Sequence, residues 1–449
     1  MHNRVTSNVA VTTTVAACAR RHDGRNKMFS WYKETKPQER RTFWACYSGW
    51  ALDTYDVQIF SFLIPTLMAV WTIGKSEAGF ISTAALLSAA LGGWIAGILS
   101  DRFGRVRILI FTVLWFSVFG FLAGFTQNYE QLLVVRVIQG LGFGGEWAVG
   151  AALMAETINP KHRAKAIGMV QSGFSVGWLG AALVTLAVQS YFDPQISWRI
   201  VFWISVLPAA IILILRRGLK DAEVYRRAVE KADEKASLAT VFKPKYLRMT
   251  LLSSLMVIGV QSAGYAIIVW TPTMLVERGI AKGSMLVTVV IMAIGTFIGF
   301  VSTSYFADRF GRRPALLLMS IVSLFATALY TLAPLGPVTL QAAGFVAIGG
   351  SIGIFSAVGP LLSELFPTEV RATCMGFSYN LGKTVGAFGI SIVGVLAGMM
   401  GLAQAIALCS FVSYLVVCLS LLMLPETRGR SLENVSTDAP ESKAIDVIA

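Results

Sequence analysis

The sequence predicts an all-α membrane protein with twelve transmembrane helices in two pseudo-symmetric six-helix bundles. Composition is the first reason: hydrophobic residues make up 55% of the chain and charged residues 14%, whereas soluble domains carry roughly 25% charged residues. The second is a series of twelve apolar runs, each near the roughly 20 residues that cross about 30 Å of hydrocarbon. The third is a repeat, because the segment Asp-Arg-Phe-Gly-Arg at 101–105 recurs at 308–312. A doubled, strongly apolar bundle is typical of transporters.

The apolar runs and the segments between them give the expected organisation. The predicted spans are 43–70, 77–100, 108–127, 130–157, 163–190, 197–216, 248–276, 284–307, 314–333, 338–366, 370–399 and 402–424. They define a basic N-terminal tail (1–41), an N-terminal bundle (42–216), a charged linker (217–247), a C-terminal bundle (248–424) and a C-terminal tail (425–449). The halves also match at other positions, such as Gly168 and Gly376.

Basic residues are distributed unevenly over the loops. The odd-numbered loops hold four, Lys75, Arg199, Arg278 and Lys282, while the tails, the linker and the even-numbered loops hold most of the others. By the positive-inside rule we expect both termini in the cytoplasm, in a bacterial inner membrane. The net charge of +13 is then a record of topology, and we do not expect a nucleic-acid partner.

The N-terminal region resembles no secretory signal peptide, because residues 1–40 contain no sustained apolar run. The first membrane helix is therefore expected to act as the targeting signal. Met28 opens a second plausible start, so residues 1–27 are interpreted either as a disordered extension or as a product of misassigned initiation.

Three motifs carry a family resemblance that spans about residues 40–433. They are the two Asp-Arg-Phe-Gly-Arg segments, the run Arg-Val-Ile-Gln-Gly-Leu-Gly-Phe-Gly at 136–144, and the closing Pro-Glu-Thr-Arg-Gly-Arg-Ser-Leu-Glu at 425–433. Together they resemble the major facilitator superfamily. Leu-Asp-Thr-Tyr-Asp at 52–56 is similar to the Asp-Gly-x-Asp signature of aromatic-acid/proton symporters and of sialate and monocarboxylate symporters, with Thr54 in place of glycine. The resemblance implies a monomeric secondary transporter that works by alternating access.

The repeated basic segments predict charged clusters at one end of the bundle. Carboxylates there can pair with arginines or with a helix N-terminus, and the resemblance implies that such clusters close the cytoplasmic side in the outward-open state. Anchoring at the lipid headgroups is the alternative. The candidate gating residues are Asp101, Arg102, Arg105, Glu156 and Arg163 in the first half, and Asp308, Arg309, Arg312, Glu364 and Arg371 in the second.

Two aspartates in the first span are the sharpest sign of coupling to protons. Asp53 and Asp56 are three residues apart, about 60° apart around a helix. Two carboxylates so close in a low dielectric are not both comfortably ionised, so we expect one to hold a proton. The alternatives are structural hydrogen bonding, or a permanent pairing of Asp56 with a cation.

Cations within the spans are candidate partners for these acids and for an anionic substrate. Arg136 can grip a carboxylate through two parallel bonds, although the resemblance favours proton coupling or gating for it. Lys383, with Tyr379 and Asn380 on its helix face, is predicted to contact an organic anion; a permanent salt bridge is the alternative. Glu146 is interpreted as a counter-ion to Lys383, a second proton site or a structural hydrogen-bonding group.

Amide and aromatic side chains complete the predicted pocket. Gln171 and Trp178 share a face of the fifth span, and Gln261 and Tyr265 share a face of the seventh. With Lys383 they predict a substrate site between the halves for a small carboxylate, aromatic or resembling sialic acid. The sequence thus favours proton-driven uptake. The alternatives are a proton-antiporting exporter, a sugar or polyol porter, and a membrane sensor that binds without transport.

Nothing in the sequence indicates an enzyme, a cofactor or a metal site. Gly140, Gly142 and Gly145 match the spacing of a dinucleotide fingerprint, but no strand precedes them and they lie within a span, so we expect close helix packing there. There is no Walker motif, the three histidines lie outside the spans, and no cysteine pair has the spacing of metal ligands.

Overall fold

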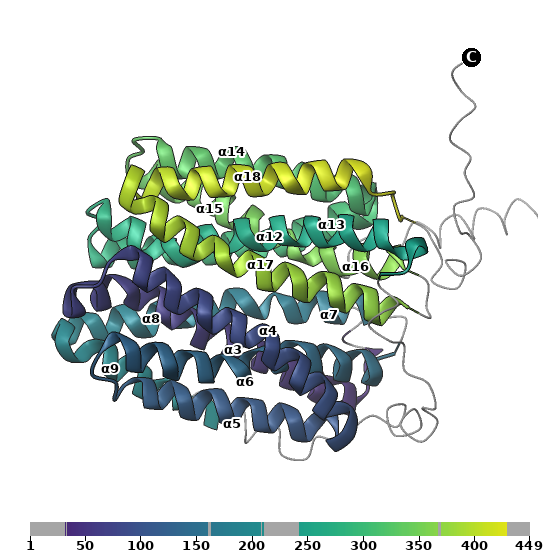
Figure 1. Ribbon diagram of the computed structural model, residues 1–449, viewed down its shortest axis with the longest axis horizontal. Coiled ribbons are helices and arrows are strands. Elements are labelled where there is room, and N and C mark those ends of the chain that lie inside the picture. The colour runs from purple at the N-terminus through teal and green to yellow at the C-terminus, as the bar shows by residue number, and fades with distance from the viewer. Residues whose placement is uncertain are drawn as a thin grey trace, which may run out of the picture.

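The computed structural model describes residues 32, 34–159, 163–207, 209–210, 242–366 and 370–428. Within these ranges the regular elements are helices that run along the long axis of the molecule (Figure 1). The N-terminal half contains α3 (Pro37–Trp71), α4 (Lys75–Phe103), α5 (Arg105–Ala123), α6 (Tyr129–Thr157), α7 (Arg163–Gln171), α8 (Gly173–Tyr191) and α9 (Pro194–Ile204). The C-terminal half contains α12 (Pro244–Glu277), α13 (Lys282–Phe310), α14 (Arg312–Leu332), α15 (Pro337–Gly353), α16 (Phe355–Leu365), α17 (Arg371–Met400) and α18 (Leu402–Met423).

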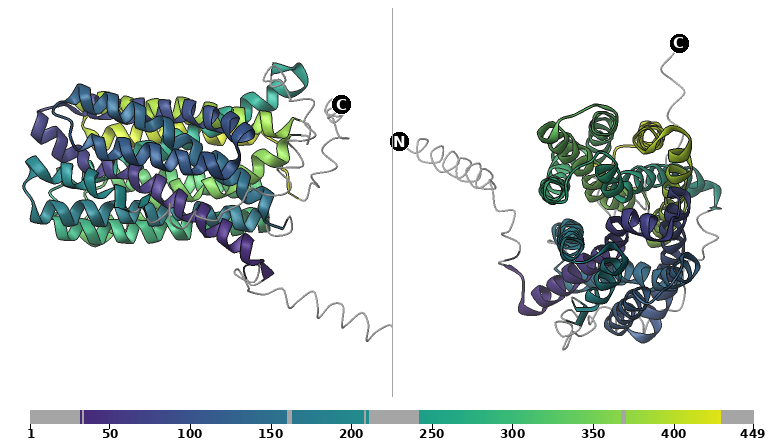
Figure 2. Two further views of the ribbon diagram at one scale, coloured as in Figure 1. Left: turned by 90° about the horizontal axis from the view of Figure 1, so that it is seen from below. Right: turned by 90° about the vertical axis from the view of Figure 1, so that its left-hand side faces the viewer.

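These helices form the twelve passes and the two stacked bundles that the sequence predicts (Figures 1 and 2). The fifth pass is divided into α7 and α8 at Ser172, and the tenth into α15 and α16 at Ile354. Nine of the described passes are long and apolar enough to cross a membrane. The others are the short α9 and two helices with several charged residues, α3, which carries Asp53 and Asp56, and α6, which carries Arg136 and Glu146.

The internal repeat has a structural counterpart at two glycines. Gly104 and Gly311 lie between α4 and α5 and between α13 and α14, with φ angles of 99° and 114°. A side chain would be strained in this region of φ. The two Asp-Arg-Phe-Gly-Arg segments therefore make the same turn in each half.

A second pair of glycines brings helices into close contact. A Cβ atom on Gly92 of α4 would overlap the Leu141 carbonyl of α6, and one on Gly299 of α13 would overlap the Gly349 carbonyl of α15. Gly144 of α6 lies equally close to the backbone of α4. The glycine-rich run of α6 thus serves helix packing, as expected, because only glycine lets the two backbones approach so closely.

The packing of the apolar core differs between the two ends of the molecule. We call the end with Pro37, Phe103 and Phe310 the terminal end, and the end with Lys75 and Glu277 the far end. Toward the far end, buried residues of both halves form one continuous cluster. Toward the terminal end they form two clusters, one in each half. Among the described residues, the apolar core of the two halves is therefore continuous at the far end and divided at the terminal end.

Polar contacts join the halves near the far end. The Thr83 hydroxyl of α4 donates to the Ala387 carbonyl of α17 at 2.9 Å and accepts from the Ser391 hydroxyl at 2.8 Å. An ion pair of 2.7 Å joins Lys75 to Glu277. These contacts reinforce the continuous core at this end.

Most predicted span boundaries agree with the helices to within a few residues, and the differences concern helix ends. α12 begins at Pro244, so the last residues of the predicted linker belong to a helix. The rest of that linker, up to residue 241, and most of both tails lie outside the described residues.

Candidate functional site

A central cavity of about 130 Å³ lies between the two bundles. It is lined by both halves: Trp50, Asp53, Thr54, Val57, Gln58, Leu86, Ala89, Phe143, Gly144, Gln171 and Phe174 from the first, and Gln261, Tyr265, Phe300, Ile352, Phe355, Tyr379, Asn380 and Lys383 from the second. Seven of these were singled out from the sequence: Asp53, Gln171, Gln261, Tyr265, Tyr379, Asn380 and Lys383.

Asp53 and Lys383 carry the charges of the central cavity. Asp53 comes from α3 and Lys383 from α17, so the two halves contribute opposite charges to the same space. They are close enough to act on each other electrostatically, but no ion pair joins them in the described part of the chain. Oδ1 of Asp53 is buried without a hydrogen-bond partner among the described residues. The geometry does not support a permanent salt bridge for Lys383.

Hydroxyl and amide groups surround this charged pair. Tyr379 and Asn380 precede Lys383 by one turn of α17, and Gln261 and Tyr265 face them from α12. The Asn380 amide donates to the Gly376 carbonyl at 3.0 Å, which orients that side chain along its own helix. The cavity can thus offer hydrogen bonds from several directions to one bound molecule.

Five aromatic residues of the lining were not predicted: Trp50, Phe143, Phe174, Phe300 and Phe355. The chain contains 27 phenylalanines, and in helices that are apolar on all sides the sequence does not show which of them face inward. These residues give the cavity largely apolar walls. Such walls with a few polar groups are typical of small-molecule sites.

Arg136 lies behind the wall of the central cavity, in a pocket of about 20 Å³ that we call the Arg136 pocket. It is 2% exposed; its Nη1 donates to Oε1 of Gln139 at 2.7 Å, and its guanidinium lies 5.0 Å from the ring centre of Phe60 and 5.8 Å from that of Phe143. Asp56 is close enough to act on it electrostatically. The described residues show no ion pair between them.

The two aspartates of the first span therefore face different surroundings. Asp53 lines the central cavity, whereas Asp56 is near Arg136 and Ser205. For the alternative that Asp56 is permanently paired with a cation, the described residues show no ion pair. Arg136, also predicted to contact substrate, does not line the central cavity in this conformation.

Glu146 faces a third pocket, also of about 20 Å³, on the terminal side of the cavity. It is 2% exposed and accepts a hydrogen bond of 3.4 Å from the Thr112 hydroxyl. Trp50 lines both this pocket and the central cavity. Glu146 thus lies one side chain away from the cavity, and its charge acts on Asp53.

Trp178, predicted to line the substrate site, is a core residue instead. Its side chain is fully buried and is absent from the cavity lining. It packs against Phe62 of α3, with ring centres 6.3 Å apart. The prediction placed it on the face of Gln171, but α7 ends at Gln171 and a new helix, α8, begins at Gly173. Trp178 therefore lies in the apolar core beside Phe62, whereas Gln171 lines the cavity.

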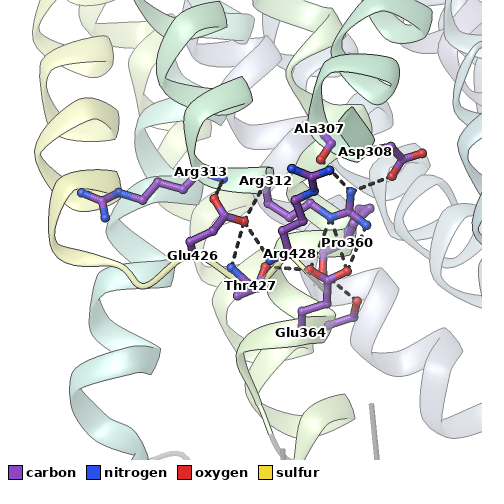
Figure 3. Close-up of polar contacts among 10 residues, drawn as sticks. Ala307, Asp308, Arg312, Arg313, Pro360, Glu364, Glu426, Thr427 and Arg428 are labelled. Atoms are coloured by element: carbon purple, nitrogen blue, oxygen red, sulfur yellow. Dashed lines mark hydrogen bonds and ion pairs between the residues drawn. The ribbon is translucent and has the colours of Figure 1, made fainter. Parts of the chain in front are cut away.

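At the terminal end of the second half, Arg312 connects two acidic residues (Figure 3). It forms ion pairs with Asp308 at 2.6 Å and with Glu364 at 3.1 Å, and it donates to the Ala307 carbonyl at 2.8 Å. The Thr427 hydroxyl donates to Glu364 at 2.6 Å. The structure thus brings together three of the predicted gating residues and adds Thr427 from the closing motif.

Glu426 is a second acidic centre beside this cluster (Figure 3). Burial would raise the pKa of its carboxyl, but hydrogen bonds from the backbone N–H groups of Arg428, Arg312, Arg313 and Thr427 hold that pKa below its ordinary value. Those bonds measure 2.8 to 3.0 Å. The carboxylate therefore caps the start of α14 and fixes the chain that follows α18.

The other predicted gating residues either make local contacts or have side chains outside the described residues. Arg309 donates to the Tyr305 hydroxyl at 2.8 Å and lies outside the Arg312 cluster. In the first half, Arg105 donates to the Ser100 hydroxyl at 2.7 Å. The side chains of Asp101, Arg102, Glu156, Arg163 and Arg371 lie outside the described residues.

Comparison with known proteins identifies the family. Residues 47–390 match the model of the Major Facilitator Superfamily. The chain belongs to this superfamily. It is accordingly a multi-pass membrane transporter and not an enzyme. Among the described residues no group of three or more His, Cys, Asp or Glu side chains could hold a metal ion.

The relatives align with this chain over most of its length. It is 51% identical to a probable 4-methylmuconolactone transporter of Cupriavidus pinatubonensis, over 93% of this chain and 97% of the relative. It is 27% identical to a putative niacin/nicotinamide transporter of Bacillus subtilis, over 89% and 100%. Among solved structures, a D-xylose–proton symporter superposes with a TM-score of 0.71 at 19% identity, over 87% and 99%, which supports the fold.

Proposed function

We propose that this transporter takes up a small organic anion together with protons, by alternating access to the central cavity. The observation that carries the proposal is the placement of Asp53 and Lys383. They come from opposite halves and line one cavity without an ion pair between them in the described chain. Lys383 is then free to receive a carboxylate, and Asp53 to receive a proton.

The charges in the cavity give a physical reason for coupling. Lys383 and Asp53 together are close to neutral, so an entering carboxylate would add an uncompensated negative charge to a site of low dielectric. A proton on Asp53 or Asp56 restores the balance and lowers the cost of moving the loaded site through the membrane. Arg136 and Glu146 act on these acids from the two side pockets.

The state of the two ends fits one stage of this cycle. With the terminal end in the cytoplasm of a bacterial inner membrane, the continuous core at the far end closes the outer side. The separate clusters at the terminal end then lie on the cytoplasmic side, where substrate would leave. Opening of the far-end contacts and approach of the two halves at the terminal end would complete the cycle.

Reconstituted transport tests the proposal. Vesicles with the purified protein are diluted into acidic medium with radiolabelled nicotinate or 4-methylmuconolactone, and protein-free vesicles correct for passive entry. We expect an inward pH gradient to drive accumulation of up to about tenfold above equilibrium exchange, the limit set by one proton per substrate at one pH unit. Uptake that ignores the gradient would exclude coupling, and accumulation driven only by the reversed gradient would indicate an exporter.

Single substitutions assign the roles. Lys383→Ala is expected to abolish binding and uptake, while Asp56→Asn is expected to retain counterflow exchange but to lose accumulation driven by the gradient. Lys245→Ala is the matched control, because Lys245 lies near the start of α12 over the ring of Tyr246, away from the cavity. Full uptake by Lys383→Ala would instead favour a sugar porter.

A further inference from the structure

Resting on the proposed function, we infer that the central cavity selects single-ring monocarboxylates over dicarboxylates, and that Phe143 enforces this choice by screening Arg136 from the substrate. The inference joins three observations: the number of cations in the lining, the size of the cavity, and the position of Phe143 between two pockets.

The lining can neutralise one carboxylate. Among the described residues that line the cavity, Lys383 is the single cation, and Asp53 already contributes one acidic group to the same cavity. A second carboxylate would meet aromatic rings and neutral amide and hydroxyl groups, but no second cation among the described lining residues. A buried charge without a partner is strongly unfavourable, so a dianion is penalised where a monoanion is not.

The size of the cavity restricts the ligand as well. Its volume of about 130 Å³ is close to the roughly 150 Å³ of an engineered cavity that holds one benzene molecule. A single ring therefore fills it. The flat aromatic walls favour a planar ring through stacking and edge contacts.

Phe143 separates Lys383 from the next cation. Its side chain lines both the central cavity and the Arg136 pocket. On one side its ring lies 5.8 Å from the Arg136 guanidinium, and on the core side its ring centre is 5.2 Å from that of Phe116. The contact with Phe116 holds the ring in place between the two pockets.

Arg136 has hydrogen-bonding capacity that Phe143 keeps from the substrate. One of its terminal nitrogens bonds Gln139, and its Nε is buried without a partner among the described residues. Asp56, which shares its surroundings, forms no ion pair with it in the described chain. If the ring of Phe143 were removed, a carboxylate at that end of the cavity could reach the guanidinium.

A matched pair of ligands isolates the effect of charge. Terephthalate and 4-nitrobenzoate have the same ring and nearly the same shape, but two and one negative charges. We expect the wild-type protein in detergent to bind 4-nitrobenzoate at least about tenfold more tightly, because the second carboxylate has no cation. Equal affinity for the two would overturn the inference and leave the proposed function standing, whereas no binding of either would count against both.

Substitution of Phe143 tests its part in the selection. In Phe143→Ala we expect the affinity ratio to fall to within about threefold through tighter terephthalate binding, and Phe143→Leu to give an intermediate ratio. Phe174→Ala is the matched control: it truncates an aromatic wall that does not border the Arg136 pocket, so it should weaken both ligands equally. The double variant Phe143→Ala/Arg136→Gln should lose the gained terephthalate binding. An unchanged ratio in both Phe143 variants would refute the screening role.

Discussion

Replacing Arg312 by alanine is expected to destabilise the C-terminal bundle more than any other single change in its charged loop. The side chain is 17% exposed and joins α13, α14 and α16 through Asp308 and Glu364. Its Nε and Nη2 both reach the carboxylate of Glu364, at 3.1 to 3.3 Å. Arg312→Ala would therefore leave Glu364 half-buried without its cation.

The magnitude follows from how far each partner is buried. Asp308 is 70% exposed, so its ion pair contributes little. Glu364 is 15% exposed, and removing one partner of a fully buried pair costs about 3 to 5 kcal/mol. Because Glu364 keeps some solvent and the hydroxyl of Thr427, we expect a loss of about 2 kcal/mol in the free energy of unfolding, below that range. For a bundle of this size the loss lowers the midpoint by about 4 to 8 °C.

Thermal unfolding in detergent, followed by intrinsic fluorescence, measures this loss. Arg309→Ala is the matched control, since this arginine of the same loop, in the described part of the chain, donates only to the Tyr305 hydroxyl and lies over the ring of Phe310. Its midpoint should stay within about 1 °C of the wild type, as for exposed charges generally. If Arg312→Ala and Arg309→Ala unfolded at the same temperature, the argument from burial would be wrong.

Three further predictions concern the cap, the glycine contacts and the far end. Because the folded-state pKa of Glu426 is lowered, its charge stabilises the fold at pH values above its ordinary pKa of about 4.3, and this stabilisation is lost as the pH falls through the folded-state pKa. The difference in unfolding midpoint between the wild type and Glu426→Gln should therefore narrow in acid. A difference that stays constant with pH would contradict this. Gly92→Ala should lower the free energy of unfolding by about 1 to 3 kcal/mol through overlap with α6. Gly97→Ala is the control: its added Cβ meets no described atom within 4 Å, so this variant should be at least as stable as the wild type. Thr83→Val removes the donor to the Ala387 carbonyl and should favour opening of the far end by about 1 kcal/mol. The opening should appear as longer distances between spin labels on α4 and α17. Unchanged distances would show that this contact does not hold the far end closed.

The fold was predictable because its signals are long and repeated. Twelve apolar runs fix the number of passes through the length that lipid requires, and the second copy of Asp-Arg-Phe-Gly-Arg fixes the symmetry. Gly104 and Gly311 make the same turn with similar φ angles, as the repeat implies. The breaks at Ser172 and Ile354 were not predicted, because neither position carries a proline or a charge that would mark a helix end.

Site residues were predictable from the sequence only where burying a polar or charged side chain in the membrane costs free energy. Asp53 and Lys383 stood out because charges within a span are costly, and both line the cavity. Phe143 and Phe174 carried no such signal, since an aromatic side chain is equally acceptable against lipid, in the core or around a substrate. Sequence periodicity located Gln261 and Tyr265 on one face of α12, but it failed for Trp178, where the helix is interrupted.

The separation of Asp53 from Asp56 has a consequence for mechanism. Three residues apart on α3, they were expected not to be ionised together; Asp53 lines the central cavity, whereas Asp56 does not and lies near Arg136 and Ser205. An angle of about 60° around the helix is enough to turn the two carboxylates toward different surroundings. A proton on Asp53 would respond directly to a bound carboxylate, whereas one on Asp56 would respond to Arg136. Under the proposed function, substrate and proton would be sensed by neighbouring turns of one helix, and movement of α3 would carry both together.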